Sequence, residues 1–145
     1  MLLSLLTHAE LVTPNIPEAA LLSGRSLQET IADPERTIAK LHQLGIQNIL
    51  LKGGHLDSQS DIKTKDQVID YFSDGQQIYP LPHQKIHTKP QSGKAFHGTG
   101  CILASAITAY AARGFNLLTA IKQAKAYLLQ TMQNAADIGK GALLL

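Results

Sequence analysis

The sequence contains a single cysteine, Cys101, among its 145 residues. A lone cysteine cannot form an intramolecular disulfide, so a disulfide-stabilised scaffold is excluded. It also argues against a zinc site built from cysteines, because such sites need several of them. Cysteine usage of this kind is typical of a reduced, cytosolic protein.

The chain also lacks a large excess of either positive or negative charge. Lys and Arg number 13 against 11 for Asp and Glu, which gives a net charge of +2 at pH 7. This balance, without a block of basic residues, argues against nucleic acid as a partner. Long apolar runs are missing too, since none approaches the roughly 18 residues of a membrane span. The opening apolar run, residues 1–6, lacks the basic stretch of a signal peptide, and we interpret it as the end of a helix or the lead-in to a buried strand.

The apolar content is that of a folded protein. Hydrophobic residues make up 44% of the chain and charged residues 17%, which argues against a disordered segment. A chain of this length buries roughly 70% of its unfolded surface, enough for a core. Internal repeats and low-complexity segments are absent from the sequence, so we expect one domain over residues 1–145.

Helix and strand signals alternate along the chain, which predicts an α/β fold. The expected elements up to residue 51 are a short β run at 10–13, a helix from Pro17 to Gly24, a helix start at 26–29 where Ser26 has the capping-box spacing, a helix from 34 to 45 capped by Asp33, and a buried strand at 47–51. Further along we expect a hairpin at 68–80, a loop at 82–97, and helices at 99–114 and 117–136. Two helices are expected to bury an apolar stripe, formed by Ile38, Leu41 and Leu44 in one and by Ile121, Ala124, Leu128 and Met132 in the other.

The most distinctive local pattern is His97-Gly98-Thr99-Gly100-Cys101 at the start of a predicted helix. Two glycines allow a sharp turn and a close approach of the backbone to a ligand. The free amides of a first helical turn, together with the helix dipole, favour an anion such as phosphate. The alternative is a plain glycine-rich loop before a helix.

Cys101 is expected in the first turn of that helix. There the helix dipole would stabilise its thiolate, which could act as a general base toward a hydroxyl group. The alternative is a small buried apolar side chain, and without further evidence that alternative is favoured.

Asn15 and Glu18 stand three residues apart at another predicted helix start. Amide and carboxylate oxygens suit Mg²⁺, which usually keeps several waters. The alternative is helix capping by Asn15 with Glu18 paired to the dipole, and the local pattern by itself favours capping.

Lys52-Gly53-Gly54 follows the predicted buried strand directly. Ligands of open α/β sheets bind at the carboxyl ends of strands, so Lys52 could neutralise phosphate charge while the glycines allow close approach. The alternative is an exposed lysine before a turn. The six histidines show no pairing on one helix face, and we expect no metal site from them.

Three segments in this order resemble one family: Val12-Thr-Pro-Asn-Ile-Pro-Glu-Ala19, Leu51-Lys-Gly-Gly-His-Leu56 and His97-Gly-Thr-Gly-Cys101. The chain resembles the hydroxymethylpyrimidine/phosphomethylpyrimidine kinases of thiamine biosynthesis, in the ribokinase-like superfamily. The resemblance runs from about residue 11 to residue 141. The ordered trio is specific, whereas each segment alone is not, and Cys101 points to this branch because most ribokinase-like sugar kinases have Asp there.

The resemblance implies an α/β/α sandwich that transfers the γ-phosphoryl group of ATP to a pyrimidine hydroxymethyl group and then to its monophosphate. It implies that Gly98, Thr99 and Gly100 form an anion hole for the transferring group and that Cys101 occupies the position of the catalytic base. The last two helices would line the adenine pocket.

The same resemblance assigns a role to each of the other candidate residues. Asn15 and Glu18 match an Asn-x-x-Glu motif tied to Mg²⁺ and phosphate positioning. Lys52, with Gly53 and Gly54, would contact the ATP phosphates. ATP and Mg²⁺ are thus the expected cofactors, and a small pyrimidine is the expected substrate.

Two features depart from the family pattern. Family members are considerably longer, and this chain matches their C-terminal part, so the sandwich would be truncated at its N-terminus. Residues 90–96 also differ from the short lead-in usual before the glycine motif. The alternatives are therefore a catalytically incomplete nucleotide-binding fragment, a subunit that needs a separate N-terminal half or a homo-oligomer to complete its sheet, and another vitamin kinase such as a pyridoxal kinase.

Overall fold

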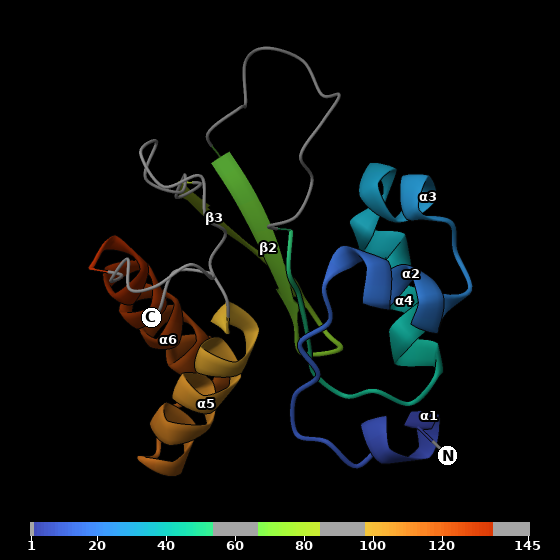
Figure 1. Cartoon of the computed structure of the whole chain (residues 1–145). Coiled ribbons are helices and arrows are strands. Elements are labelled where there is room, and N and C mark those ends of the chain that lie inside the picture. The colour runs from blue at the N-terminus through green and yellow to red at the C-terminus, as the bar shows by residue number, and fades with distance from the viewer. Residues whose placement is uncertain (1, 54–66, 85–97, 135–145) are drawn as a thin grey trace. The chain divides into compact units, whose positions relative to one another are not determined.

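The computed structural model describes residues 2–53, 67–84 and 98–134 (Figure 1). The chain divides into two compact units, Met1–Lys85 and Ile86–Leu145, and each is described by itself. In the described residues, the first unit combines four helices with a small sheet, and the second contains two helices. The expected α/β class is confirmed.

The four helices of the first unit are α1 (Leu2–Leu6), α2 (Ile16–Ser23), α3 (Leu27–Ala32) and α4 (Pro34–Gln43). The helical interpretation of the opening apolar run is therefore confirmed. The predicted helix starts are confirmed as well: the side chains of Asn15, Ser26 and Asp33 each accept a hydrogen bond from the amide three residues later. Such caps satisfy amides that a helix leaves without a partner at its first turn.

The sheet of the first unit consists of β1 (Ile49–Leu51), β2 (Gln67–Ser73) and β3 (Ile78–Gln84), in that order and antiparallel. The predicted hairpin is confirmed. The loop predicted from residue 82 is wrong at its start, because β3 continues to Gln84. Prolines weakened the strand signal, but β3 has a neighbour on only one side in the described sheet, and edge strands tolerate them.

A segment before α2 runs parallel to β1. Val12 pairs with Ile49, and Asn15 pairs with Lys52. The backbone amide of Val12 donates to the Asn48 carbonyl at 3.0 Å. The expected β run at 10–13 is thus present as isolated bridges that continue to residue 15, and these bridges place the end of this segment beside the end of β1.

The core of the first unit lies between the helices and β1. Buried apolar side chains come from α2, α4, β1 and the loop between α4 and β1, and they are Ile16, Ala19, Ile38, Leu41, Ile46, Ile49 and Leu51. All three residues of β1 are buried, as predicted for this strand. The predicted burial of Leu44 is wrong: its side chain is 39% exposed. Helix α4 ends at Gln43, so Leu44 leaves the buried stripe.

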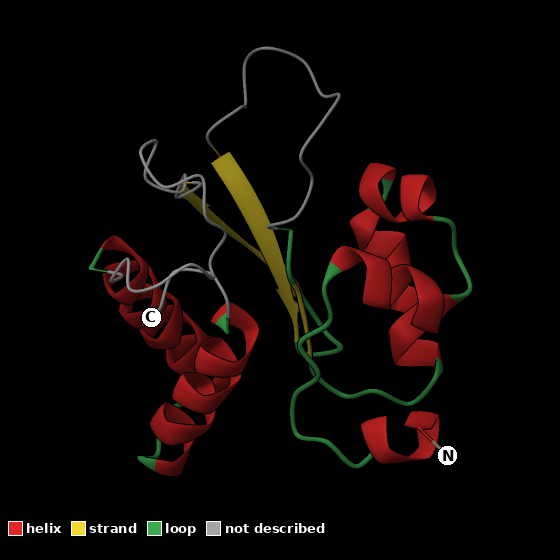
Figure 2. Ribbon diagram, in the orientation of Figure 1, coloured by secondary structure: helices red, strands yellow, loops and turns green. Residues whose placement is uncertain are grey.

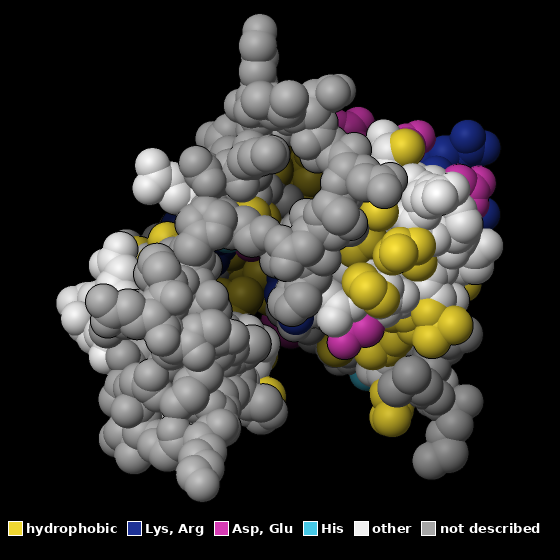
Figure 3. All heavy atoms as spheres, turned by 45° about the horizontal axis from the view of Figure 1, so that its top comes forward, with side chains coloured by type: hydrophobic (Ala, Val, Ile, Leu, Met, Phe, Trp, Pro, Cys, Tyr) yellow, Lys and Arg dark blue, Asp and Glu magenta, His cyan; other side chains and the backbone are white. Residues whose placement is uncertain are grey.

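Apolar side chains also reach the surface of this unit. The most exposed are Leu21 of α2, Leu27 and Ile31 of α3, and Leu5 of α1. Figure 3 shows apolar side chains gathered on the helical part of the unit.

The second unit contains α5 (Thr99–Ala112) and α6 (Leu117–Gln133), joined by a short turn. The two helices pack side by side (Figure 2). Both are close to their predicted bounds. The predicted stripe of α6 is buried at Ile121 and Ala124, whereas Leu128 and Met132 are only half-buried. Among the described helices, none has the length and apolar character needed to cross a membrane.

Candidate functional site

The start of α2 is closed by its own side chains. The Oδ1 atom of Asn15 accepts a hydrogen bond from the Glu18 amide at 2.8 Å. In return, the Oε2 atom of Glu18 accepts one from the Asn15 amide, also at 2.8 Å. This reciprocal capping box satisfies two backbone donors at once. The capping interpretation of the pair is therefore confirmed.

The same pair offers few free ligand atoms for a metal ion. Within the ranges that the structure describes, no group of three or more His, Cys, Asp or Glu side chains could hold one. Mg²⁺, however, is commonly bound by one or two carboxylates together with substrate phosphates and waters. Glu18 is exposed and has one carboxylate oxygen outside the capping box. It thus fits a single carboxylate ligand, while Asn15 Oδ1 is already engaged.

Asn15 and Lys52 lie side by side. They face each other in a parallel bridge, and the Lys52 amide donates to the Pro14 carbonyl at 2.9 Å. Both residues follow the carboxyl ends of neighbouring extended segments, the place where open α/β sheets bind ligands. The structure therefore brings together a residue predicted for metal binding and one predicted for phosphate binding, although 36 residues of chain separate them in the sequence.

Gly53 is held by the neighbouring strand β2. A Cβ atom at this position would collide with the backbone carbonyl of Ile69, so only glycine fits without a shift. The Gly53 amide donates to Oδ1 of Asp70 at 2.8 Å, and Asp70 is only 6% exposed. Gly53 thus has a packing reason to be glycine, in addition to its predicted contact with phosphate.

Asp70 was missed by the sequence analysis. Its signal is a single acidic residue within the apolar run of β2, where a buried carboxylate needs hydrogen-bond donors. By accepting from the Gly53 amide it fixes the backbone that follows Lys52. The adjacent predicted residue Gly54 lies outside the described residues, as does His97 of the glycine motif.

The start of α5 differs from that of α2. Gly98 occupies the capping position with φ of 84°, a left-handed conformation that favours glycine. No side chain caps this helix in the described part of the chain. Thr99 and Gly100 are half-buried in the first turn, where free amides and the helix dipole attract anions.

Cys101 is exposed in that first turn. The interpretation as a buried apolar side chain is therefore wrong, and the buried side chains of α5 are those of Leu103 and Ile107 instead. An exposed thiol beside the open amides of a helix start is in a position to meet a ligand bound there.

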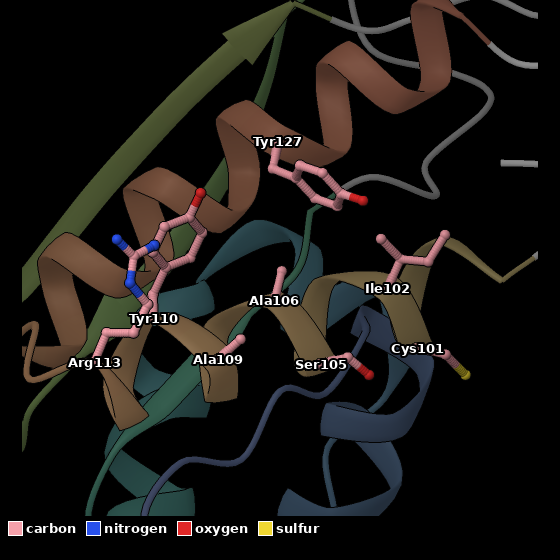
Figure 4. Close-up of a pocket in the computed structure, with 8 residues that line it drawn as sticks. All are labelled: Cys101, Ile102, Ser105, Ala106, Ala109, Tyr110, Arg113 and Tyr127. Carbon is pink, nitrogen blue, oxygen red and sulfur yellow. The ribbon is translucent and has the colours of Figure 1, made fainter.

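A groove runs along α5 in the second unit and has a volume of about 550 Å³ (Figure 4). It is lined by Cys101, Ile102, Ser105, Ala106, Ala109, Tyr110, Arg113 and Tyr127. Arg113 lies with its guanidinium 5.7 Å from the ring centres of both Tyr110 and Phe115. The sequence analysis did not single out Arg113 or Tyr127. Arg113 is a single basic residue at the end of α5 and Tyr127 is an aromatic residue within α6, and neither pattern indicates a groove.

The predicted site residues therefore fall into two groups, one in each unit. Asn15, Glu18, Lys52 and Gly53 belong to the first unit, and residues 98–101 belong to the second.

Comparison with known proteins covers both units. The family model described as phosphomethylpyrimidine kinase matches residues 1–145. A hydroxymethylpyrimidine/phosphomethylpyrimidine kinase from Aquifex aeolicus is 36% identical over 91% of this chain and 47% of its own length. The enzyme of that name from Rhizobium meliloti is 38% identical over 94% of this chain and 48% of its own length. This chain thus spans about half the length of the curated relatives it matches.

Solved structures give the same fold. The pyridoxal kinase from Staphylococcus aureus in complex with pyridoxal matches with a TM-score of 0.80 and 31% identity, over 97% of this chain and 48% of that one. The same enzyme in complex with ADP matches equally well in fold, at 30% identity. The fold is ribokinase-like, and with the family model matching from the first residue to the last, the chain belongs to the phosphomethylpyrimidine kinase family.

Proposed function

We propose that this chain takes part in the ATP-dependent phosphorylation of hydroxymethylpyrimidine and of its monophosphate in thiamine biosynthesis. The observation that carries the proposal is the open start of α5, where Gly98, Thr99 and Gly100 precede an exposed Cys101 and no side chain of a described residue caps the helix. The relatives are named hydroxymethylpyrimidine/phosphomethylpyrimidine kinases, which supports this reaction. A structural neighbour was solved in complex with ADP, which supports ATP as the phosphoryl donor.

Phosphoryl transfer requires mostly positioning and electrostatic stabilisation. In the proposed reaction the first-turn amides of α5 donate to the oxygens of the transferring phosphoryl group, on which negative charge is spread. The Cys101 thiolate accepts the proton of the substrate hydroxyl while that oxygen forms its bond to the γ-phosphorus. The bond from the γ-phosphorus to the bridging oxygen breaks, and ADP leaves with the electron pair.

The first unit has a supporting role in this proposal. The ammonium group of Lys52 neutralises phosphate charge, and Asp70 holds the backbone beside it through the Gly53 amide. Glu18 would hold a Mg²⁺ ion through its outer carboxylate oxygen, and such an ion would neutralise phosphate charge. Asn15 keeps Glu18 in place through the capping box.

The proposal also concerns how much of the enzyme these 145 residues contain. We propose that residues 1–145 form part of one ribokinase-like domain, because one family model and one solved fold match both units. Since the relatives are about twice as long, pyrimidine binding would draw on the remainder of the fold. A nucleotide-binding fragment without transfer activity is the corresponding alternative.

A second acceptor is favoured by one observation. The structural neighbours include pyridoxal kinases with a TM-score of 0.80, one of them solved with pyridoxal. Pyridoxal also carries a hydroxymethyl group on an aromatic ring, so the same chemistry would serve it. It is therefore the acceptor to compare with the pyrimidine.

The test is a kinase assay with Mg-ATP and either hydroxymethylpyrimidine or pyridoxal, with the phosphorylated product measured by mass spectrometry. Cys101→Ala is expected to lower transfer by about 10²–10⁴-fold, the usual contribution of a general base, while ATP affinity by calorimetry stays close to wild type. Thr108→Ala, two turns further along α5 and outside the groove lining, is the matched control and should retain full activity.

Each outcome is informative. Pyrimidine product that disappears in Cys101→Ala supports the proposal. Pyridoxal product alone favours the second acceptor. Mg-ATP binding without product for either acceptor favours the incomplete fragment, and a Cys101→Ala variant with the wild-type rate contradicts the assignment of the base.

A further inference from the structure

Strand β3 forms one edge of the sheet in the part of the first unit that the structure describes. It pairs with β2 on one side, and no described strand lies on its other side (Figure 1). An edge strand presents unpaired backbone amides and carbonyls, which can pair with a strand of another molecule. Proteins limit such pairing with short edge strands, charged side chains, bulges, prolines or a covering segment. The outer side of β3 therefore requires one of these devices.

Three of these devices are absent from β3 itself. The strand has seven residues, which is longer than the mean of about 5–6 for a strand. Its sequence, Ile78-Tyr-Pro-Leu-Pro-His-Gln84, contains no Lys, Arg, Asp or Glu. Its residues pair one to one with Gln67–Ser73 of β2, so this register contains no bulge. What remains within β3 is its pair of prolines.

The hairpin turn shows in which direction the backbone of these prolines points. In an antiparallel pair, residues that exchange backbone hydrogen bonds alternate with residues whose amides and carbonyls point away from each other. The Asp74 amide donates to the Gln77 carbonyl at 3.3 Å, so these two residues form a pair of the first kind. Pro80 and Pro82 lie three and five pairs further along the register. These odd steps place both prolines in pairs of the second kind, with their backbone nitrogens directed away from β2.

A contact on the other side of β2 gives the same direction. A Cβ atom at Gly53 would meet the Ile69 carbonyl oxygen, so this carbonyl points toward the residues that follow β1 and away from β3. Ile69 lies opposite Pro82. The backbone of Pro82, and of Pro80 two residues earlier, therefore faces the outer edge. Because proline has no N–H, this edge lacks a donor at both positions.

We propose that Pro80 and Pro82 close the outer edge of β3 to strand addition, so that a second copy of this chain cannot extend the sheet there. The outward amides that remain are at the ends of the strand, Ile78 and Gln84. An added strand would have to leave the carbonyls opposite the two prolines without a donor, which is costly for buried backbone. Both proline rings are exposed, whereas Leu81 between them is buried, so core packing does not account for them. The inference is independent of transfer activity.

The experiment restores the missing donors in the whole chain. Pro80→Val/Pro82→Val adds two N–H groups together with side chains that favour strands, both at exposed positions. Pro17→Val makes the same change at an exposed position of helix α2, outside the sheet, and is the matched control. Self-association is measured by analytical ultracentrifugation over a range of protein concentrations. Hydrogen exchange of the amides of residues 80 and 82 is measured by NMR on the same samples.

We expect the double valine variant to self-associate about tenfold or more strongly than wild type and Pro17→Val, because each new backbone hydrogen bond contributes to the association. The amides of residues 80 and 82 should exchange more slowly at high than at low protein concentration, since they then donate to the added strand. Pro80→Ala/Pro82→Ala adds the same donors with a smaller apolar side chain than proline. Its self-association should also exceed that of wild type.

Four results would overturn the proposal. The first is equal self-association of wild type and the double valine variant, and the second is equal self-association of Pro17→Val, which would attribute the effect to valine itself. The third is association that leaves the exchange of amides 80 and 82 unchanged, which would place the contact elsewhere. The fourth is slow exchange of these amides in the dilute monomer, which would mean that another part of the chain already covers the edge. If circular dichroism shows that the double variant does not fold, the single variants Pro80→Val and Pro82→Val, each with one new donor, replace it in the same measurements.

Discussion

Helices α2 and α5 both begin at residues that the sequence marks as candidate ligands, yet their starts are built differently. At α2, Asn15 and Glu18 cap each other's backbone amides at 2.8 Å. At α5, Gly98 occupies the capping position and no described side chain accepts from the first turn. The segments at both helix starts contain the polar or glycine residues that are typical of such positions.

The difference indicates which start is available for an anion. At α2 the Asn15 and Glu18 amides are used by the fold itself, and the outer oxygen of Glu18 remains for a cation. Among the residues that the structure describes, no side chain accepts from the first-turn donors at α5, and a phosphate would satisfy them. A closed cap therefore argues for a structural role first, and an open one for binding.

The largest effect is expected from adding a capping side chain at the start of α5. Gly98→Asn keeps a residue that tolerates positive φ and adds a side-chain acceptor at the capping position. The new acceptor would compete with phosphate for the amides, so we expect kcat of the proposed transfer reaction to fall by about 10²–10³-fold, as for loss of one oxyanion-hole donor. The thermal midpoint should change little. Unchanged turnover would show that these amides do not take part.

A second comparison concerns the two candidate-site glycines, Gly53 and Gly98. A Cβ atom at Gly53 would collide with the Ile69 carbonyl, whereas one at Gly98 meets nothing within 4 Å. Gly53→Ala is therefore expected to lower the free energy of unfolding by about 1–3 kcal/mol, the usual cost of overpacking. Gly98→Ala should cost about 1 kcal/mol, from its left-handed backbone alone.

Urea unfolding followed by circular dichroism measures both variants. Equal losses of stability in the two would contradict the assignment of Gly53 to packing against β2.

A third test separates capping from ligand binding at α2. Asn15→Ala removes the cap acceptor and is expected to lower the free energy of unfolding by about 1 kcal/mol, while Asn15→Asp retains the cap. Glu18→Gln keeps an oxygen for the capping box but removes the charge. If Glu18 binds Mg²⁺, calorimetric Mg-ATP affinity falls in Glu18→Gln while stability holds; if both quantities hold, Glu18 is a capping residue alone.

The smallest expected effect concerns acid. The pKa of Glu29 is lowered from its ordinary value of 4.5, mainly because its carboxylate accepts hydrogen bonds from the Ser26 amide and hydroxyl. A lowered folded-state pKa means that the cap of α3 is fully effective above pH 4.5 and is lost as pH falls through the folded pKa. Helical signal should therefore decline in acid less steeply in Ser26→Ala, which has less of this cap to lose. Identical acid profiles would contradict the role of the pair.

Much of the secondary structure followed from local rules. Asn15, Ser26 and Asp33 were expected at helix starts because their side chains accept from amides only a few residues away, and the structure has all three caps. The buried strand β1 was expected from its continuous apolar run. Local rules were wrong where the partner is distant: β3 extends to Gln84 because β2 pairs with it, despite two prolines.

The candidate site likewise has some features that local residues predict and others that depend on contacts between distant segments. The sequence by itself determined the open glycine motif, the capping residues and, through its ordered trio of segments, the family, because each depends on residues close together in the chain. Only the tertiary structure decided that Asn15 lies beside Lys52, that Gly53 meets Ile69 and Asp70, and that Cys101 is exposed along a groove. These depend on contacts between segments distant in sequence, and no local pattern of residues specifies which strand or helix will pack against another.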